Sequence, residues 1–266
     1  MNGLSCAPGV KQWLTTTRHP RILHIFDRAC NLINERGEVL SIVTREIGDG
    51  PFNMVVAENI SFFSDLHTES RISIADSRLT LGRLIIYTGN AQLWNPCPDW
   101  NRLHTHRDTI VQQIAQLRFT NNQFSDSLPS AVAIADLPSC LTATRQLAGL
   151  GIGLTPSGDD FIMGAMYAAW IIHPPEAASV LTREIANIAA PLTTSLSAAW
   201  LKAAGKGEAG VLWHDFFGAL VSANTLRVRE TLKNILAVGE TSGADTLAGF
   251  TRVFNSLMKK SDASYE

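Results

Sequence analysis

The chain has 266 residues, of which 45% are hydrophobic and 17% are charged, and its formal net charge at pH 7 is −2. This charged fraction lies below the ~25% that is usual in soluble proteins, which indicates extensive burial and fits a homo-oligomer. The small net charge argues against the basic surface that DNA- and RNA-binding proteins use. The length allows one large domain or two of moderate size.

The sequence predicts no targeting or membrane segment. Its N-terminal residues lack the basic stretch and the following apolar stretch of a secretory signal. The longest apolar run, residues 161–172, is shorter than the ~20 residues of a membrane span. The four cysteines are widely spaced and form no CxxC pair, which indicates reduced thiols. We therefore expect a soluble, cytoplasmic protein that has no membrane partner.

The first hundred residues have the pattern of a small β domain. A long semi-apolar run at 22–33 is followed by turn-forming residues and a second apolar run at 39–44. Shorter strand candidates follow at 53–57, 71–75 and 84–87. Residues 95–99 contain two prolines and interrupt this pattern. We predict a barrel-like β domain over residues 1–98.

The remainder of the chain has helical periodicity. Between residues 100 and 118 the apolar side chains of Leu103, Ile110, Ile114 and Leu117 form a helical stripe. Further helices are predicted at 140–148, 159–172, 176–189, 192–204, 213–223, 228–236 and 244–258. Residues 99–266 are thus predicted to form an α-helical domain, and the chain to be an α+β protein.

Two related segments of the helical part form the most specific pattern in the chain. Residues 149–164 read GLGIGLTPSGDDFIMG, and residues 239–249 read GETSGADTLAG. Each has a Gly, a Thr and a Ser-Gly pair, then an Asp three residues after the Ser and a Gly four residues after that Asp. Glycine-rich loops that open a helix bring free backbone N–H groups and a hydroxyl together. The repetition predicts one polar site built from a duplicated element.

A purely structural interpretation competes with this one. Ser157 and Asp160 have capping-box spacing, and Thr155 before Pro156 is a suitable N-cap, so these residues could serve only to start a buried helix. Four glycines within residues 149–158, two consecutive carboxylates and the second copy of the pattern favour a functional site instead.

The charges around the first loop restrict the type of ligand that it can bind. Helix N-termini attract an anion, whereas Asp159 and Asp160 repel one. Either Mg²⁺ bridges a carboxylate and a phosphate, or one Asp accepts from an N–H₂ group while backbone amides hold the anionic end of the same molecule. The chain has no Walker lysine and no Gly-x-Ser-x-Gly elbow, which argues against nucleotide hydrolysis and serine-hydrolase chemistry.

The candidate site residues are taken from these motifs. The predicted catalytic residues are Asp160, Asp245 and Ser157. The predicted ligand-binding residues are Gly151, Gly153, Thr155, Ser157, Gly158, Asp159, Thr193, Thr194, Thr241, Ser242, Gly243 and, from a turn of the β domain, Asn53. In this hypothesis the two Ser-Gly pairs donate to the anion, and Asp160 or Asp245 orients the N–H₂ group. No residue is assigned as a metal ligand.

The two loops and the Thr193-Thr194 segment resemble the AllH-type family of bacterial proteins, and weaker similarity extends into the β part at Gly50-Pro-Phe. The resemblance implies a subunit of an oxamate carbamoyltransferase in allantoin degradation, a part of purine catabolism. There, oxalurate and phosphate give oxamate and carbamoyl phosphate. It also implies FdrA-like and AllG-like partner subunits, but it assigns no catalytic residue.

Two alternatives stay open beside a carbamoyltransferase subunit. The chain could be a non-catalytic assembly or binding subunit whose loops cap helices at an interface. It could also be a Mg²⁺-dependent enzyme that transfers a phosphoryl group. The site hypothesis makes one geometric prediction, that Asp160 and Asp245 face a common cavity.

Overall fold

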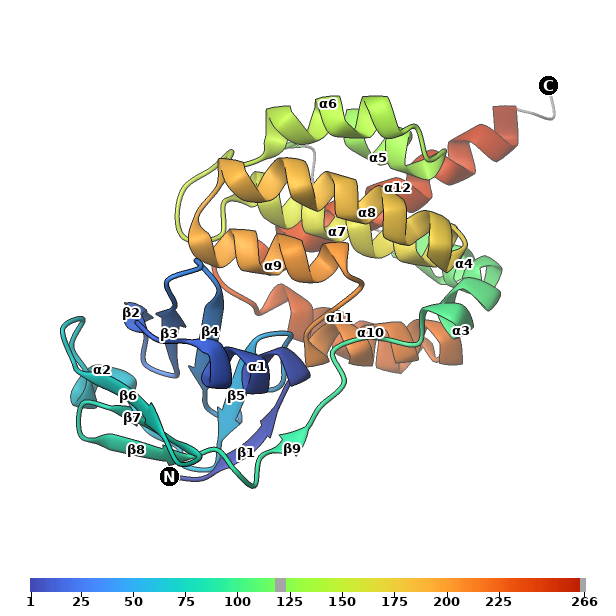
Figure 1. Cartoon of the computed structure of the whole chain (residues 1–266). Coiled ribbons are helices and arrows are strands. Elements are labelled where there is room, and N and C mark those ends of the chain that lie inside the picture. The colour runs from blue at the N-terminus through green and yellow to red at the C-terminus, as the bar shows by residue number, and fades with distance from the viewer. Residues whose placement is uncertain (118–122, 264–266) are drawn as a thin grey trace. The chain divides into compact units, whose positions relative to one another are not determined.

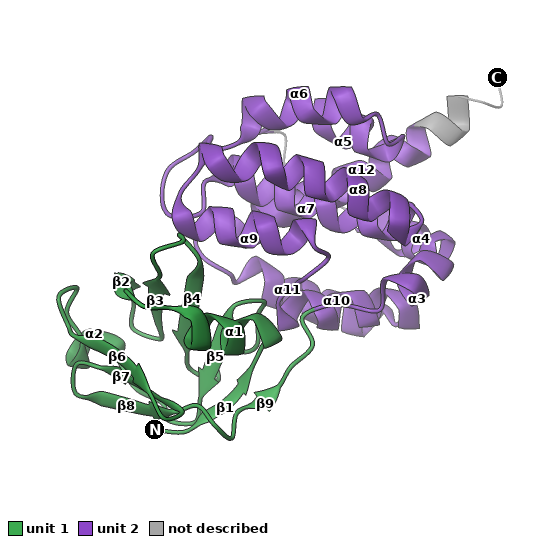
Figure 2. Ribbon diagram, in the orientation of Figure 1, with its two compact units in different colours: residues 1–96 green, residues 97–266 purple. Residues whose placement is uncertain are grey.

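The structure is a computed structural model that describes residues 1–117 and 123–263, with the side chains of 260–263 left aside. The chain forms two compact units, Met1–Pro96 and Cys97–Glu266 (Figure 2). The described strands belong to the first unit, and the second unit is helical (Figure 1). This arrangement confirms the α+β class, whereas the division into a β-rich domain 1–98 and an α-helical domain 99–266 stays a prediction.

The first unit contains two sheets and two helices (Figure 1). Its elements are β1 (Gly3–Cys6), α1 (Pro8–Thr16), β2 (Arg21–Ile25), β3 (Ala29–Ile33), β4 (Val39–Val43), β5 (Asn53–Val56), α2 (Phe62–Asp65), β6 (Ile72–Ala75), β7 (Arg78–Leu81), β8 (Leu84–Tyr87) and β9 (Gln92–Leu93). The larger sheet has the order β2-β3-β4-β5-β1-β9, and the smaller one has the order β6-β7-β8. Within the larger sheet, β4 with β5 and β1 with β9 are parallel pairs, and the other neighbours are antiparallel.

The larger sheet does not close, so the barrel-like prediction is wrong. Its edge strands are β2 and β9, which do not pair with each other. The apolar core is covered instead by the smaller sheet and α1, which pack on one face of the larger sheet. Leu32 and Met54 of the larger sheet belong to the same buried cluster as Leu79 and Ile86 of the smaller sheet and Trp13 of α1. Two layers that pack face to face bury an apolar core without a barrel.

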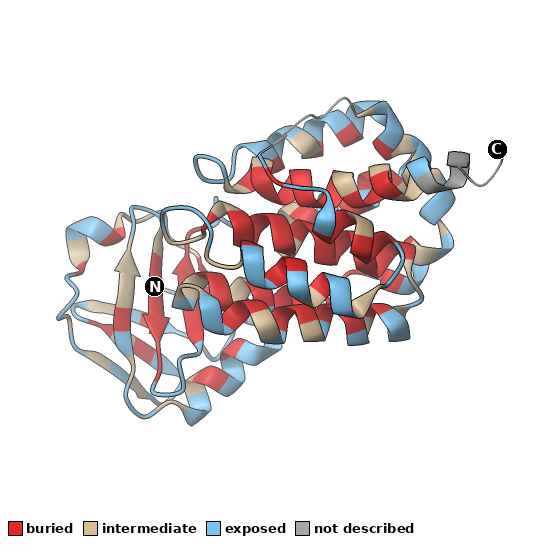
Figure 3. Ribbon diagram, turned by 90° about the horizontal axis from the view of Figure 1, so that it is seen from above, coloured by how far each residue is buried: buried red, intermediate tan, exposed pale blue. Residues whose placement is uncertain are grey.

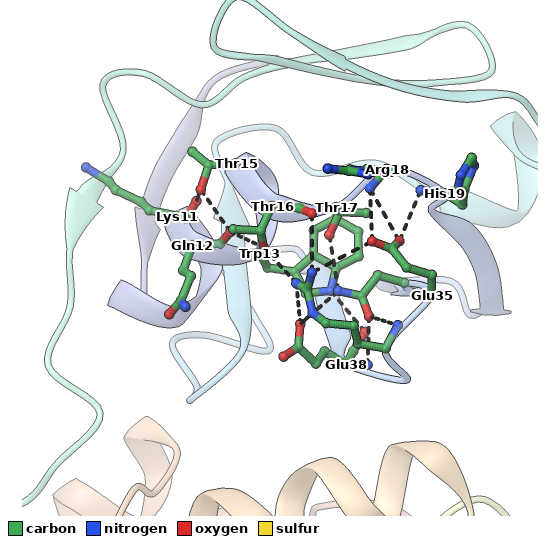
Figure 4. A network of polar contacts seen from close by, with 12 residues as sticks. Lys11, Gln12, Trp13, Thr15, Thr16, Thr17, Arg18, His19, Glu35 and Glu38 are labelled. Atoms are coloured by element: carbon green, nitrogen blue, oxygen red, sulfur yellow. Dashed lines mark hydrogen bonds and ion pairs between the residues drawn. The ribbon is translucent and has the colours of Figure 1, made fainter.

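A network of polar contacts joins the end of α1 to the β3–β4 hairpin (Figure 4). Nη2 of Arg36 lies 2.7 Å from both the Glu38 carboxylate and the Thr16 hydroxyl oxygen. The indole N–H of Trp13 donates to the carbonyl oxygen of Glu38 at 2.9 Å. The hairpin turn therefore holds the last turn of α1 in place.

The second unit is a bundle of helices (Figure 1). Its elements are α3 (Trp100–Thr105), α4 (Arg107–Gln116), α5 (Ser127–Ala133), α6 (Leu137–Leu147), α7 (Ser157–Ile172), α8 (Pro175–Ala189), the 3-10 turn η1 (Ala190–Leu192), α9 (Ser195–Gly205), α10 (Val211–Ser222), α11 (Thr225–Leu236) and α12 (Ser242–Ala263). Helix α7 is central, because it packs against α3, α5, α6, α8, α9 and α12. All of its residues except Ser157 and Met163 are buried, and Figure 3 shows buried residues concentrated inside the bundle.

Aromatic side chains fill the space around α7. The ring of Tyr167 lies 5.0 Å from that of Trp213 on α10, which in turn lies 5.4 Å from Phe250 on α12. Trp170 stacks on Trp100 of α3 at 5.5 Å. Tilted and offset ring pairs at these separations are favourable beyond the area that they bury. These contacts fix α7 relative to three other helices of the unit.

Two hairpins of the bundle, α6–α7 and α11–α12, are structural equivalents. Each second helix starts in backbone contact with the end of the first. A Cβ atom on Gly158 would lie 2.1 Å from the carbonyl oxygen of Leu147, and one on Gly243 would lie 1.9 Å from that of Ile235. The equivalent glycines of the two sequence motifs thus perform the same packing task.

The second helices of the two hairpins, α7 and α12, also cross each other through equivalent glycines. A Cβ atom on Gly164 would lie 1.8 Å from the carbonyl oxygen of Thr246, and one on Gly249 would lie 1.9 Å from that of Phe161. The contact is therefore reciprocal and brings backbone against backbone. Only glycine allows two helices to approach this closely.

The helices predicted between residues 140 and 258 are observed as α6 to α12, with shifts of a few residues at their ends. The predicted helix at 100–118 is two helices, α3 and α4, which meet at His106, and residue 118 lies outside the described residues. The predicted run at 22–33 is two antiparallel strands, β2 and β3. Within the described part of the chain, no helix combines the length and the apolar character that crossing a membrane requires.

Candidate functional site

The structure brings the two glycine-rich loops together. The hydroxyl oxygens of Thr155 and Ser242, one from each loop, are hydrogen-bonded at 2.9 Å. Both side chains are half-buried. Because these residues lie at the starts of α7 and α12, the two helices begin next to each other. The loops are thus neighbours, while a ligand that binds between them stays a prediction.

Asp160 lies near these hydroxyls and near Asp245, since the hydroxyls of Ser242 and Thr155 and the charge of Asp245 all act on its pKa. Each Asp precedes a crossing glycine, Gly164 or Gly249, by four residues, and residues four apart share one face of a helix. The face of each helix that contacts the other helix is therefore also the face that carries the Asp. Asp160 is 5% exposed and Asp245 is 2% exposed. A cavity shared by the two carboxyl groups stays a prediction.

The surroundings of Asp160 favour the protonated form of its carboxyl group. Burial raises the pKa of its carboxyl group to about 8, and the negative charges of Asp245 and Asp159 add to this effect. The hydroxyl groups of Ser242 and Thr155 act in the opposite direction but are outweighed. Oδ2 of Asp160 has no hydrogen-bond partner among the described residues. The two loops therefore enclose a buried carboxyl group whose pKa is raised by its surroundings.

The capping-box interpretation of the first loop is wrong. Helix α7 begins at Ser157, and its N-cap is Pro156, which makes no side-chain capping hydrogen bond. The hydroxyl of Thr155 bonds to Ser242 of the other loop instead. The polar residues of this loop are therefore not explained by helix initiation.

Asp159, predicted to bind ligand, directs its carboxylate into the fold. Oδ1 accepts from the backbone N–H of Gly149 at 2.8 Å, and Oδ2 accepts from the hydroxyl of Ser197 at 2.7 Å and from the hydroxyl of Thr193. Asp159 is 1% exposed. Ser197 was not among the predicted site residues. Its signal in the sequence is its position three residues after the Thr194 cap, in a hydroxyl-rich helix start.

Thr194 holds the other end of the first loop. Its hydroxyl donates to the carbonyl oxygen of Leu154 at 2.5 Å and accepts from the backbone N–H of Ser197 at 3.1 Å, so that it also caps α9. The loop 149–156 is thus held at both ends. Thr194 bonds to Leu154 near the end of the loop, and Gly149 at its beginning bonds to Asp159, which also accepts from Thr193 and Ser197. The predicted ligand contacts of Thr193 and Thr194 stay predictions beside these structural contacts.

The backbone N–H groups of the two Ser-Gly pairs divide into two kinds. Those of Gly158 and Gly243 donate to the carbonyl oxygens of Leu150 and Val238, at 2.8 and 3.0 Å, so in this structure they already have acceptors. Those of Ser157 and Ser242, the first residues of their helices, donate no backbone hydrogen bond within the described residues. The N–H groups of the two serines are therefore better placed to meet an anion.

The remaining predicted site residues have varied surroundings. Gly151 and Gly153 adopt positive φ angles of 123° and 91°, which favour glycine, and both are exposed. Thr241 is exposed at the start of the second loop. Asn53, in the other unit, is buried and donates from Nδ2 to the carbonyl oxygen of Gly48 at 3.0 Å. Ligand contacts of these four residues stay predictions.

The described residues contain no cluster of three or more His, Cys, Asp and Glu side chains arranged to hold a metal ion. The third carboxylate near the pair, that of Asp159, is bonded on both oxygens to Gly149, Thr193 and Ser197. A Mg²⁺ ion held by fewer carboxylates together with a phosphate stays a prediction.

Ser242→Ala tests the contact that joins the two loops. The change removes the hydroxyl that bonds to Thr155 and that lowers the pKa of Asp160. We expect the pKa of Asp160 to rise by about 0.7 unit, because a hydrogen bond contributes ~1 kcal/mol and one pKa unit corresponds to ~1.4 kcal/mol. ¹³C NMR of labelled carboxyl groups measures the titration. Thr142→Ala, an exposed change on α6, is the matched control, and equal titration curves in both variants would contradict the expectation.

The family described as oxamate carbamoyltransferase subunit AllH matches residues 147–254, and the AllH family N-terminal domain matches residues 2–93. The chain belongs to the AllH family. The first match begins at the end of α6 and reaches into α12, so it includes both glycine-rich loops. No solved structure matches the chain.

Proposed function

We propose that this subunit supplies the acid–base centre of a carbamoyltransferase that acts on oxalurate or oxamate and on carbamoyl phosphate. The observation that carries the proposal is the buried pair of Asp160 and Asp245, in which burial raises the pKa of Asp160 to about 8. General acids and bases work best when their pKa lies near the working pH. The family description, an oxamate carbamoyltransferase subunit, supports the same class of reaction.

In the proposed reaction Asp160 exchanges a proton with the amide nitrogen. When oxalurate reacts, a phosphate oxygen attacks the carbamoyl carbon, and the bond from that carbon to the nitrogen of oxamate breaks. The departing nitrogen takes the proton of Asp160, which becomes a carboxylate. In the reverse direction this carboxylate accepts the proton of the oxamate nitrogen as it attacks carbamoyl phosphate. One residue thus serves both directions.

The surrounding groups position the reactants in this proposal. The carboxylate of Asp245 accepts from the N–H₂ of the carbamoyl group. The hydroxyls of Thr155, Ser157 and Ser242, with the backbone N–H groups of the two serines, donate to the anionic end or to the carbonyl oxygen as charge develops on it. Oxalurate, oxamate and carbamoyl phosphate all combine an anionic end with an amide group, as this set of donors and acceptors requires.

Partner subunits complete the site in this proposal. The charged groups that act on Asp160 are Asp245 and Asp159, both negative, whereas the proposed substrates are anions. A positive charge must therefore come from elsewhere to hold them. We propose that FdrA-like and AllG-like subunits, which the family resemblance implies, contribute it. The family description as a subunit supports an assembly of this kind.

Asp245→Asn tests the proposed function. We expect turnover of the assembled enzyme to fall by about 10² or more, because the acceptor for the carbamoyl N–H₂ becomes a partial donor. Asp215→Asn, at an exposed position of α10, is the matched control and should retain wild-type turnover. Turnover with oxalurate and phosphate, together with size-exclusion analysis of the assembly, provides the measurement.

Three other results would each decide the question differently. Unchanged turnover in Asp245→Asn would contradict the proposed site. Loss of assembly with normal folding would favour an assembly subunit whose loops lie at an interface. Binding of Mg²⁺ at millimolar concentration that disappears in Asp245→Asn would favour the phosphoryl-transfer alternative.

A further inference from the structure

We propose that Asp159 is a positioning residue, whose carboxylate clamps the first loop and the start of α9 to the first turn of α7 and so places Thr155 over Asp160. The inference rests on the proposed function in taking Asp160 as the acid–base group. It gives Asp159 a role different from that of a ligand contact.

The first support is the set of donors around this carboxylate. A backbone N–H and two hydroxyls, from Gly149, Ser197 and Thr193, all donate to it, and a carboxylate that accepts on both oxygens needs no proton of its own. A charge that is 1% exposed is tolerated only when such donors compensate it. The site is therefore built around an ionised Asp159.

The second support is the geometry of the clamp. Asp159 holds Gly149 at the beginning of the loop, and Thr194, on the same turn of chain as Thr193, holds Leu154 near its end. Thr155 directly follows Leu154 and reaches Ser242 of the second loop. Movement of the loop away from α9 would therefore break the Thr155–Ser242 contact and open Asp160 to water.

The third support is electrostatic. Asp159 on α7 and Asp245 on α12 are the charged groups that act on Asp160, and both raise its pKa, after burial. Tyr167, further along α7, is affected by Asp160, but burial raises the pKa of its phenol well above the usual range, so it stays neutral. An ionised Asp159 therefore both shapes the loop and favours the proton on Asp160.

Asp159→Asn in the full chain tests the proposal without substrate or partner subunits. We expect the titration midpoint of Asp160, followed by ¹³C NMR of labelled carboxyl groups, to fall, because a neighbouring negative charge is removed, and to fall by less than Ser242→Ala raises it. We also expect faster hydrogen exchange at the N–H of Gly149, because the loop is held less firmly. An unchanged midpoint together with unchanged exchange would overturn the proposal.

Ser197→Ala separates the two effects and keeps the test informative if Asp159→Asn does not fold. This change removes one of the three donors but leaves the charge of Asp159 in place. We expect faster exchange at Gly149 with a smaller change in the titration midpoint of Asp160 than in Asp159→Asn, because the charge of Asp159 is kept. Exchange at the wild-type rate would overturn the clamp. Asp215→Asn is again the control that should alter neither measurement.

Kinetics of the assembled enzyme distinguish a positioning residue from a ligand contact. A positioning role predicts that Asp159→Asn moves the pH dependence of kcat to lower pH, whether or not KM changes through Thr155. A raised KM with an unchanged pH dependence would overturn it in favour of direct binding. If the carbamoyltransferase proposal itself fails, no turnover is seen in any variant, while the titration and exchange results still decide the role of Asp159.

Discussion

Asp160→Asn is expected to lower turnover by roughly 10²–10⁴ and, at the same time, to stabilise the folded protein above neutral pH. The loss of turnover follows from the proposed reaction, in which Asp160 exchanges a proton with the substrate nitrogen. The gain in stability follows from burial, which raises the pKa of this carboxyl group from 3.8 to about 8. Asparagine has a similar shape but no charge to bury.

The direction of the pH effect follows from these values. Below pH ~4 Asp160 is protonated in both the folded and the unfolded wild type, and its contribution to stability is fully present. As the pH rises toward 8 the unfolded chain ionises first, and wild-type stability falls by up to ~1.4 kcal/mol per pH unit. Asp160→Asn lacks this loss, so its advantage in unfolding free energy should grow from pH 5 to pH 8.

Urea unfolding at several pH values measures this difference. Asp215→Asn, at its exposed position, should follow the wild type throughout the range. A constant difference between wild type and Asp160→Asn would show that Asp160 titrates normally in the fold, and it would remove the main support for Asp160 as an acid near neutral pH.

Gly164→Ala is expected to destabilise the second unit by about 3 kcal/mol or more, because overpacking at a rigid contact is costly. The added Cβ would lie 1.8 Å from the carbonyl oxygen of Thr246 and 2.8 Å from the backbone nitrogen of Phe250. Backbone atoms cannot turn aside as a flexible side chain can, so α7 and α12 must separate. Separation would also move Asp160 away from Asp245.

Gly218→Ala is the matched control for this substitution. Gly218 also lies inside a helix, α10, but a Cβ atom there would meet nothing within 4 Å. Alanine should therefore stabilise the protein at this position by about 0.5–1 kcal/mol. Thermal and urea unfolding of the two variants compare them directly. A tolerated Gly164→Ala would contradict the close crossing of the two helices.

The sequence predicted that the two loops are neighbours, because the repeated motif includes the glycines at which α7 and α12 pack together. The glycine four residues after each Asp is the signal: it marks the face of α7 and of α12 on which the helices meet. Helices α6 to α12 were also predicted, since a run of apolar side chains with helical spacing is a strong local signal. The proximity of Asp160 and Asp245 follows from these two features together.

Other features depend on contacts that no local pattern records. The Gly149, Thr193 and Ser197 contacts of Asp159 join three segments, so the sequence alone could not distinguish this carboxylate from that of Asp160. Closure of a barrel depends on which strands meet at the edges, and this is a non-local property. Helix α1 was overlooked although Pro8 after Ala7 is a typical first helical residue.

The duplicated hairpins are alike in backbone but not in chemistry. The residue before Asp160 is Asp159, whereas the residue before Asp245 is Ala244. Asp160 therefore has a second carboxylate beside it in its own helix turn, and the charge of Asp159 adds to burial in raising the pKa of Asp160. In the proposed function, this difference gives the site a direction that matches a substrate with two different ends, which a symmetric pair of aspartates would lack.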